Sequence, residues 1–409
     1  DPYLRDIVAI AAGYDFSLAL DRYGYVYAWG NDAYLQLGDG RSNLNMSTLI
    51  SAVPVRVVDG TAAGTKTNVA AANYLAHVVA ISAADGHAAA LRSNGTVVAW
   101  GRRDDGQLGI GNSSALFENV ERYIPMPRQL HKAPDSLWMG GGEELNRDYG
   151  EFLYGAVAVT TGGSYNNAGY IDPVTQKTVM VETNTPAFTL VLGSDNANVQ
   201  KIFGTGDNTY GQLGQEPAAL AGSSTPILTL NADVDKVILG REYDAASDSI
   251  LYPEEKNGVR WQNTLTGEGE RIVQISAGAG HAILRTVESD PNAYTNDSTG
   301  GWRSTADIDL AYVWGRDQEG QMGDDLAGAG ANYHRPVRVR KGDYERHNTD
   351  YTYLTGLYDA AAGAFHNISL NLYYNNWDKD GRFGYAWAWG NNTATPDEGD
   401  VSIIGQLGS

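Results

Sequence analysis

The sequence contains no cysteine. Disulfide bridges, thiolate metal sites and cysteine nucleophiles are therefore excluded together. No apolar run approaches the ~20 residues that a membrane-spanning helix needs, so we expect no insertion into a membrane. No G-x-x-x-x-G-K-[ST] phosphate loop and no G-x-S-x-G nucleophile elbow occurs, and no spacing of histidines and carboxylates singles out a catalytic pair. We therefore expect a protein that is not an enzyme and that holds no cofactor, apart from the calcium site considered below.

Positive charge is also scarce. The 29 Lys and Arg residues stand against 49 Asp and Glu residues, which gives a formal net charge of −20. Such a surface repels phosphate backbones and anionic lipids, so nucleic acid is not an expected partner. An acidic chain without cysteine fits an exported bacterial protein. We therefore expect a location outside the cell or at the bacterial cell surface, with Asp1 at the start of a mature or trimmed chain.

One pattern occurs five times along the chain. Each copy has strand-like apolar segments, then Trp-Gly, then Gly-Gln-Leu-Gly or a close variant, and such repetition indicates a repeat architecture. The copies occupy Ile7–Gly38, Val79–Gly109, Pro186–Gly214, Ile272–Gly323 and Ala360–Gly408, the last two with insertions. The Trp positions are Trp29, Trp100, Trp314 and Trp389, and the third copy has Thr205 there.

Each copy predicts three short β-strands. In the second copy, VAISA leads through Gly to AAAL, and the turn Ser93-Asn94-Gly95 leads to TVVAW. Asn-Gly between apolar runs is a strong hairpin signal, and short runs without helical periodicity indicate an all-β fold. The pattern therefore predicts a closed β-propeller with each Trp packed between neighbouring blades. In each signature one apolar residue lies between turn-forming residues: Leu37, Leu108, Leu213, Met322 and Leu407.

Seven blades are predicted, with six as the alternative. The two longest intervals between copies each have room for a decayed blade, one at Val237–Trp261 and a less regular one within Leu137–Pro173. Residues 1–409 are expected to form a single propeller domain. Its long inserted loops are expected at about 110–185, 231–270, 286–310 and 340–358.

The ends of the chain suggest how the ring closes. A Pro-led apolar strand, such as Pro54–Val57 or Pro336–Val339, follows every signature except the last, which stops at Ser409. Pro2-Tyr3-Leu4 at the other end has the same character. We expect this N-terminal segment to complete the last blade, because open sheet edges invite aggregation.

With these repeats, the chain resembles the regulator of chromosome condensation family, whose members are typically seven-bladed propellers. Leu35 in place of Gly and Thr205 in place of Trp depart from the family pattern. The founding member is a chromatin-bound nucleotide exchange factor, a role that a net charge of −20 does not favour here. The family also resembles a secreted bacterial propeller that inhibits β-lactamases, which provides a precedent for protein binding outside the cell.

Three histidines, His87, His281 and His366, share one repeat position. A metal site would need them to converge, but equivalent positions of different blades lie apart around a ring. We therefore expect structural hydrogen bonds at these positions.

A candidate calcium loop lies within the last copy. Asn376, Asp378 and Asp380 place oxygen ligands at alternate positions before Gly381, but the twelfth position is Trp387 and not Glu. A full EF-hand is excluded. A Ca²⁺ site is the alternative to a plain Asp-Gly hairpin tip.

Aromatic residues concentrate in the inserted loops and are the predicted binding surface, because Tyr and Trp bury much area and still form hydrogen bonds. The candidates are Tyr344, Tyr351, Tyr353, Tyr358, Tyr373, Tyr374 and Trp377. The alternative is that they pack the insertions onto the propeller. The expected function is a non-catalytic interaction module that binds a protein or a carbohydrate. The alternatives are a self-assembling subunit of a bacterial surface layer or filament and a secreted enzyme inhibitor.

Overall fold

The structure is a computed structural model. It describes residues 3–41, 50–60, 73–111, 123–131, 152–171, 178–194, 200–218, 220–231, 242–244, 249–251, 270–288, 310–318, 320–323, 332–339, 354, 357–374 and 382–390.

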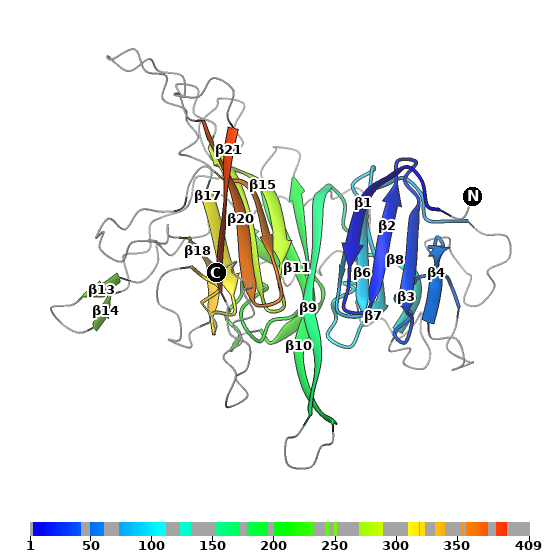
Figure 1. The fold of residues 1–409 in the computed structure, drawn as a ribbon, viewed down its shortest axis with the longest axis horizontal. Coiled ribbons are helices and arrows are strands. Elements are labelled where there is room, and N and C mark those ends of the chain that lie inside the picture. Colours follow the sequence, from blue (N-terminus) through cyan, green and yellow to red (C-terminus); the bar gives the residue numbers. More distant parts are fainter. Residues whose placement is uncertain are drawn as a thin grey trace. The chain divides into compact units, whose positions relative to one another are not determined.

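Strands group into sheets in chain order (Figure 1). The first sheet holds β1 (Ile7–Ala12), β2 (Phe16–Asp21), β3 (Val26–Asn31) and β4 (Ile50–Arg56). The second holds β5 (Val78–Ala84), β6 (His87–Arg92), β7 (Val97–Arg102) and β8 (Tyr123–Gln129). The third holds β9 (Ala156–Ile171), β10 (Thr178–Ser194), β11 (Gln200–Asp207) and β12 (Gly222–Asn231).

The remaining strands follow the same plan. The fourth sheet holds β15 (Glu270–Ala277), β16 (His281–Glu288), β17 (Leu310–Gly315) and β18 (Tyr333–Arg338). The fifth holds β19 (Leu357–Ala362), β20 (His366–Tyr374) and β21 (Arg382–Gly390). β13 (Glu242–Asp244) and β14 (Ser249–Leu251) form a two-stranded sheet. The all-β class is confirmed, and the described residues include no helix long and apolar enough to cross a membrane.

The structure corrects the expectation for residues 137–173. Residues 156–171 form no separate blade and no inserted loop, because as β9 they pair along their length with β10 in the third sheet. Figure 1 shows this pair running beyond the rest of its sheet. At the other end of β9, the Thr161 backbone N–H donates to the Ser82 Oγ of β5 at 3.0 Å. β13 and β14 lie in the region of the other expected decayed blade, so the described residues show five sheets and this two-stranded fragment.

Two compact units divide the chain. Unit 1 contains Asp1–Asp195, Ile202–Thr209 and Ala218–Thr229, and unit 2 contains Asn196–Lys201, Tyr210–Pro217 and Leu230–Ser409. In both units, apolar side chains are buried between consecutive sheets. Representative pairs are Val26 with Trp100, Val97 with Phe203, and Val313 with Leu357.

The Gln of the signature holds its own loop in place through its side chain. The side-chain Oε1 of Gln36 accepts from the Tyr34 backbone N–H at 2.7 Å, and Gln107 and Gln212 accept equivalently at 3.0 and 2.9 Å. The apolar residues that follow, Leu37, Leu108, Leu213 and Met322, are buried, whereas Leu407 lies outside the described residues. Each signature is therefore a closed polar turn with one apolar side chain directed into the core.

The signature Trp connects its sheet to the preceding copy. The indole Nε1 of Trp100 donates to the Gln36 carbonyl oxygen at 2.9 Å. Trp314 donates to the Gln212 carbonyl at 2.9 Å, and Trp389 to the Gln321 carbonyl at 2.8 Å. Trp29 is half-buried, and its indole N–H has no hydrogen-bond partner among the described residues. The bond thus joins consecutive copies wherever a preceding signature is described.

The third copy keeps this link without a Trp. The Thr205 hydroxyl lies 2.9 Å from the Gly106 carbonyl oxygen. The Thr189 hydroxyl donates to the Gln107 carbonyl at 2.8 Å, where a Trp would otherwise bond. Thr189 therefore takes the place of the indole at the Gln107 carbonyl, and Thr205 adds a second link to the same signature, which explains how this copy tolerates the change.

Closure of the ring is not confirmed. Tyr3 and Leu4 lie outside any strand, Tyr3 is 77% exposed, and the fifth sheet has three strands in the described residues. The first sheet nevertheless has an uncovered face. Ile10 is 79% exposed, whereas Ile81, its counterpart in β5, packs against the core of the first sheet.

A buried carboxylate completes the first signature turn. Asp32 Oδ1 accepts from the Leu37 backbone N–H at 3.0 Å, and Asp317 plays the same part for Met322. Burial raises the pKa of Asp32 to about 6, although the Leu37 hydrogen bond opposes the shift. The ionised form is therefore the costly one in the folded protein.

We predict that removing the indole N–H lowers the free energy of unfolding by an amount that depends on which Trp is changed. Trp100→Phe leaves the buried Gln36 carbonyl without a donor and should lower the free energy of unfolding by about 1–3 kcal/mol beyond the loss of ring area. Trp389→Phe should cost less, because Asn367 also donates to the Gln321 carbonyl. Trp387→Phe is the matched control, since its Nε1 is buried without a partner. Urea unfolding measures all three, and equal costs for Trp100→Phe and Trp387→Phe would contradict the assignment.

Asp32 should make stability depend on pH in a particular direction. Because its pKa is higher in the folded state, the folded protein binds more protons between about pH 4 and 6, and the free energy of unfolding should fall as the pH rises through this window. Asp32→Asn keeps an acceptor for Leu37 and should remove this fall, with a gain at pH 7 of up to about 3 kcal/mol. A profile that Asp32→Asn does not flatten would refute the role.

Candidate functional site

The loop residues predicted to bind a partner are only partly described. Tyr358, in β19, is 62% exposed. Tyr373 and Tyr374 end β20, where their backbones pair with Phe383 and Arg382 of β21. The other candidates, Tyr344, Tyr351, Tyr353 and Trp377, lie outside the described residues, as do the proposed calcium ligands Asn376, Asp378 and Asp380. Within the part of the chain that is described, no three acidic or histidine side chains group closely enough to hold a metal ion.

His87 and His281 form buried hydrogen bonds, as predicted, whereas the half-buried ring of His366 forms none with a described residue. His87 Nε2 lies 3.1 Å from the Thr189 hydroxyl, whose proton goes to the Gln107 carbonyl, so His87 is the donor. His281 Nε2 lies 3.0 Å from Asn367 Oδ1, and Asn367 Nδ2 donates to the Gln321 carbonyl at 2.9 Å. Burial lowers the pKa of His87 to about 3. His87 is thus a neutral link in a buried chain of hydrogen bonds, and His281 forms the equivalent link through Asn367.

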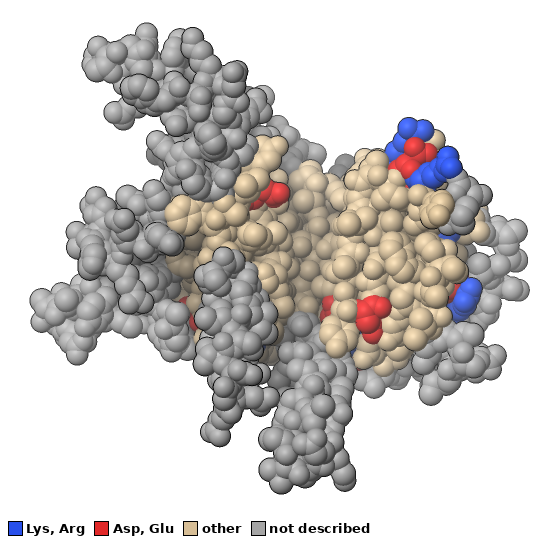
Figure 2. All heavy atoms as spheres, in the orientation of Figure 1, with Lys and Arg blue, Asp and Glu red and all other residues tan. Residues whose placement is uncertain are grey.

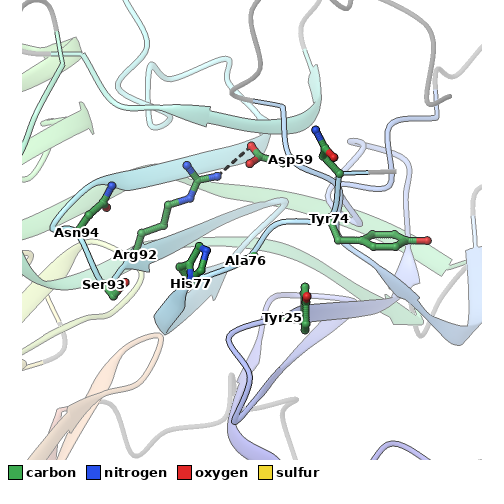
Figure 3. A pocket seen from close by; sticks show the side chains of 9 residues that line it. Tyr25, Asp59, Tyr74, Ala76, His77, Arg92, Ser93 and Asn94 are labelled. Atoms are coloured by element: carbon green, nitrogen blue, oxygen red, sulfur yellow. Dashed lines mark hydrogen bonds and ion pairs between the residues drawn. The ribbon is translucent and has the colours of Figure 1, made fainter. Parts of the chain in front are cut away.

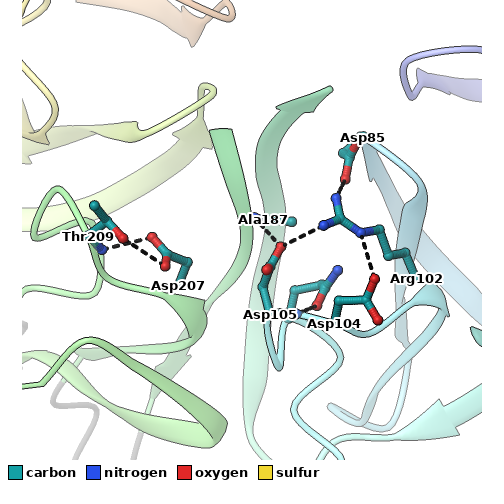
Figure 4. A network of polar contacts seen from close by, with 8 residues as sticks. Asp85, Arg102, Asp104, Asp105, Ala187, Asp207 and Thr209 are labelled. Carbon is teal, nitrogen blue, oxygen red and sulfur yellow. Dashed lines mark hydrogen bonds and ion pairs between the residues drawn. The ribbon is translucent and has the colours of Figure 1, made fainter. Parts of the chain in front are cut away.

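A second polar cluster surrounds Arg102 at the end of β7 (Figure 4). Its guanidinium lies 2.5 Å from Asp85, 3.5 Å from Asp104 and 3.4 Å from Asp105. Asp105 also accepts from the Ala187 backbone N–H of β10 at 2.9 Å, so the cluster joins the second sheet to the third. Burial raises the pKa of Asp85, and Arg102 opposes that shift. Because three carboxylates already surround this guanidinium, the cluster is a structural joint.

An open pocket of about 560 Å³ lies in unit 1 (Figure 3). The turn between β2 and β3 and the turn between β6 and β7 contribute to it, together with the segment that connects the first two sheets. Its lining residues are Tyr25, Asp59, Asn73, Tyr74, Ala76, His77, Arg92, Ser93 and Asn94. Most are polar or aromatic, and Tyr74 is 38% exposed. A pocket of this size and chemistry can hold a side chain or a short peptide segment.

Backbone contacts fix the two turns that border the pocket. The Val78 N–H donates to the Gly24 carbonyl at 3.1 Å, and the Ser93 N–H donates to the His77 carbonyl at 2.8 Å. Gly24 has a φ of 84°, and a Cβ there would lie 3.0 Å from the His77 backbone nitrogen. Only glycine permits this approach. The pocket is therefore part of the rigid repeat and does not depend on an inserted loop.

An aromatic cluster holds a guanidinium at the edge of the pocket. The Cζ of Arg56 lies 4.5 Å from the ring centroid of Tyr25, 4.7 Å from that of Tyr74 and 5.4 Å from that of Tyr27. Arg56 Nη2 donates to the Tyr27 hydroxyl at 3.1 Å, and that hydroxyl donates to Asp21 at 3.3 Å. The hydrogen bond that Arg56 donates to the Tyr27 hydroxyl is the main cause that raises the pKa of Arg56. We name these four residues, Arg56, Tyr25, Tyr27 and Tyr74, the Arg56 cluster.

Sequence reasoning missed this pocket. It treated the short turns as scaffold and looked for function in the insertions, whereas the pocket is formed by turns and by the connection between copies. The available signal was the alternation Tyr23-Gly24-Tyr25-Val26-Tyr27, which places aromatic side chains on one face at the start of β3.

Figure 2 shows few charged groups on the visible described surface, with blue and red atoms together in the corner where Figure 1 places the first strands.

Family models match the first part of the chain. The model described as "Regulator of chromosome condensation (RCC1) repeat" matches residues 7–36 and 78–107, and a second model with the same description matches residues 23–91. Together these segments span residues 7–107, which include β1 to β7 and every residue that lines the pocket.

Curated proteins are similar over longer stretches. The ultraviolet-B receptor UVR8 of Arabidopsis thaliana is 23% identical over 343 residues, which cover 78% of this chain and 67% of UVR8. The human protein HERC6, a probable E3 ubiquitin-protein ligase, is 26% identical over 226 residues, or 51% of this chain. That match covers only 19% of HERC6, so the chain corresponds to a small part of it.

Two solved structures show a distant likeness. Human WBSCR16 is 17% identical, and the match covers 89% of this chain and 57% of that one, with a TM-score of 0.46. Prp20p of Saccharomyces cerevisiae, described with its binding properties to Gsp1p and histones, is 16% identical. That match covers 93% of this chain and 72% of Prp20p, with a TM-score of 0.40.

Proposed function

We propose that this chain is a non-catalytic protein-binding module on a β-propeller scaffold. The premise is that it carries regulator of chromosome condensation (RCC1) repeats. Propellers built from this repeat are typically protein-interaction modules. The observation that carries the proposal is the pocket between the first and second sheets, with its wall of tyrosines and polar side chains.

The character of the pocket favours a protein partner. Asn94 Oδ1 accepts from the Thr96 N–H at 3.1 Å, which leaves its amide NH₂ directed outward as a donor. Tyr25 and Tyr74 present ring surface beside it, and the Arg92–Asp59 ion pair at 2.9 Å keeps one wall in place. Tyrosine rings, amides and a guanidinium together are typical of the centre of protein interfaces. Because the turns are fixed by backbone hydrogen bonds, little ordering accompanies binding.

The predicted aromatic loop surface is kept as a second surface for the same function, and the 62% exposure of Tyr358 is consistent with it. Location outside a bacterial cell or at its surface is part of the proposal, supported by the acidic, cysteine-free composition. A carbohydrate partner, self-assembly into a surface layer or filament, and inhibition of a secreted enzyme are the alternatives. A calcium site at Asn376, Asp378 and Asp380 is also kept as an alternative.

We also propose that the repeats close into a ring, with the N-terminal segment completing the last blade. Two observations support it. Ile10 is exposed where its counterpart Ile81 is packed, and Trp29 has no partner where Trp100, Trp314 and Trp389 each donate to a preceding signature. In a closed ring the preceding signature of Trp29 is the last one, which includes Gln406.

The pocket can be tested with a library of random 12-residue peptides displayed on phage and selected on the immobilised protein. Tyr74→Ala removes one wall, and Ser93→Trp fills the mouth while the Ser93 backbone bond is kept. Each should weaken the selected peptides by at least about tenfold, close to 1.4 kcal/mol. Tyr358→Ala is the matched control on the other surface and should bind as the wild type does. Selected peptides that lose affinity only on Tyr358→Ala would move the function to the loop surface, and a library that yields no binder would count against the proposal.

Closure makes a separate prediction for Trp29. In a closed ring, Trp29→Phe removes a buried donor and should lower the free energy of unfolding by about 1–3 kcal/mol, as Trp100→Phe does. In an open array the same change should cost well under 1 kcal/mol, because the indole N–H then bonds only to water. Urea unfolding of the two variants side by side separates these outcomes.

A further inference from the structure

We infer that Arg56, beside the pocket of unit 1, binds a carboxylate side chain of the partner protein, and that neighbouring residues of the same partner segment occupy the pocket. The inference rests on the proposed protein-binding function and names the chemistry of the bound segment.

The first step is the charge balance of Arg56. Arg22 pairs with Asp6, Arg92 with Asp59 and Arg102 with Asp85, but Arg56 forms no ion pair in the described structure. The carboxylate linked to it is Asp21, which it reaches only through the Tyr27 hydroxyl. Asp21 is further engaged by the backbone N–H groups of Tyr23 and Tyr25, each at 2.9 Å. Arg56 therefore carries a positive charge without a direct counterion.

The second step is the set of donors that Arg56 still offers. Only Nη2 is used, by the Tyr27 hydroxyl. None of its other nitrogens is among the buried polar atoms without a partner, so these N–H groups face solvent. A guanidinium with two free N–H groups on one edge matches the two oxygens of a carboxylate.

The third step is preorganisation. The rings of Tyr25, Tyr27 and Tyr74 hold the guanidinium through cation–π contacts, so the side chain is already ordered before a ligand arrives. Two of these rings, those of Tyr25 and Tyr74, also line the pocket, as Figure 3 shows. Arg56 itself does not line the pocket, so an acidic side chain would bind Arg56 beside the pocket, while a neighbouring part of the same segment contacts the Tyr25 and Tyr74 rings inside it. Such ordering lowers the entropic cost of binding.

The choice of a carboxylate follows from the number of cations. Recognition of phosphate groups in proteins generally uses a cluster of arginines. Here the neighbouring Arg92 is paired with Asp59, and Arg56 is the single cation of its cluster. One planar guanidinium with a single negative partner is the arrangement that a Glu or Asp side chain satisfies.

Peptides selected from the library on the wild-type protein supply the probe. We expect the enriched sequences to share an Asp or Glu, and their synthetic forms to bind Arg56→Gln at least about tenfold more weakly than the wild type. Replacing the shared Glu by Gln in the peptide should cause the same loss on the wild type and little further loss on Arg56→Gln, because both changes remove one interaction. Arg56→Lys keeps the charge without the fork and should bind with intermediate affinity.

Arg22→Gln is the matched control, because Arg22 is an exposed arginine on the turn between β2 and β3 and its guanidinium lies over a different ring, that of Tyr23. It should leave the affinity unchanged. A thermal melt of each variant checks that loss of Arg56 does not unfold the first sheet. Peptides that are weakened by Ser93→Trp but not by Arg56→Gln would overturn the carboxylate inference and leave the protein-binding pocket standing. A library without any binder would overturn both.

Discussion

The hydrogen bond from an indole N–H to the carbonyl of the preceding Gly-Gln-Leu-Gly signature is the interaction on which the rest of the structure depends. It buries a large aromatic ring between two sheets and at the same time satisfies a backbone carbonyl that no strand partner reaches. The same Gln closes its own loop through its side chain, so one residue fixes both the shape of the turn and its attachment to the next sheet. Where the indole is absent, Thr189 donates to the corresponding Gln107 carbonyl, and Thr205 bonds to the neighbouring Gly106 carbonyl. The carbonyl is thus the constant partner, and the donor can vary.

The sequence predicted those parts of the fold that are encoded locally. The hairpin of the second copy follows from Ser93-Asn94-Gly95, and the burial of Leu108 follows from its place between turn residues. The place of β9 was not predicted, because Ala156–Ile171 matches no copy of the repeat and was assigned to a decayed blade of its own, whereas it pairs with β10 in the third sheet. Register between distant segments is not visible in a local pattern. The closing strand was expected from Pro2-Tyr3-Leu4, yet Tyr3 is exposed and outside any strand, so composition alone did not place that segment.

The candidate site escaped sequence analysis for a related reason. Its residues come from two turns and from the connection between two sheets, and no spacing in the chain brings Tyr25, Tyr74 and Asn94 together. The pattern of charges along the sequence did not predict the site either. It shows that arginines are few, but it does not show which of them form ion pairs. Arg102 lies among three carboxylates and serves the scaffold, whereas Arg56 lies among three tyrosines. Only the structure separates the arginine that holds the fold from the one that faces solvent.

A protein with a net charge of −20 that binds a carboxylate must overcome its own field. At physiological ionic strength that field decays over about 8 Å, so it acts mainly on the approach of a partner, while contact with Arg56 decides the bound state. Repulsion on approach disfavours partners with runs of acidic residues. A carboxylate among neutral or basic neighbours avoids that repulsion and still reaches the guanidinium. The acidic surface and Arg56 thus work together, the first by rejecting polyanions and the second by selecting an isolated acidic side chain.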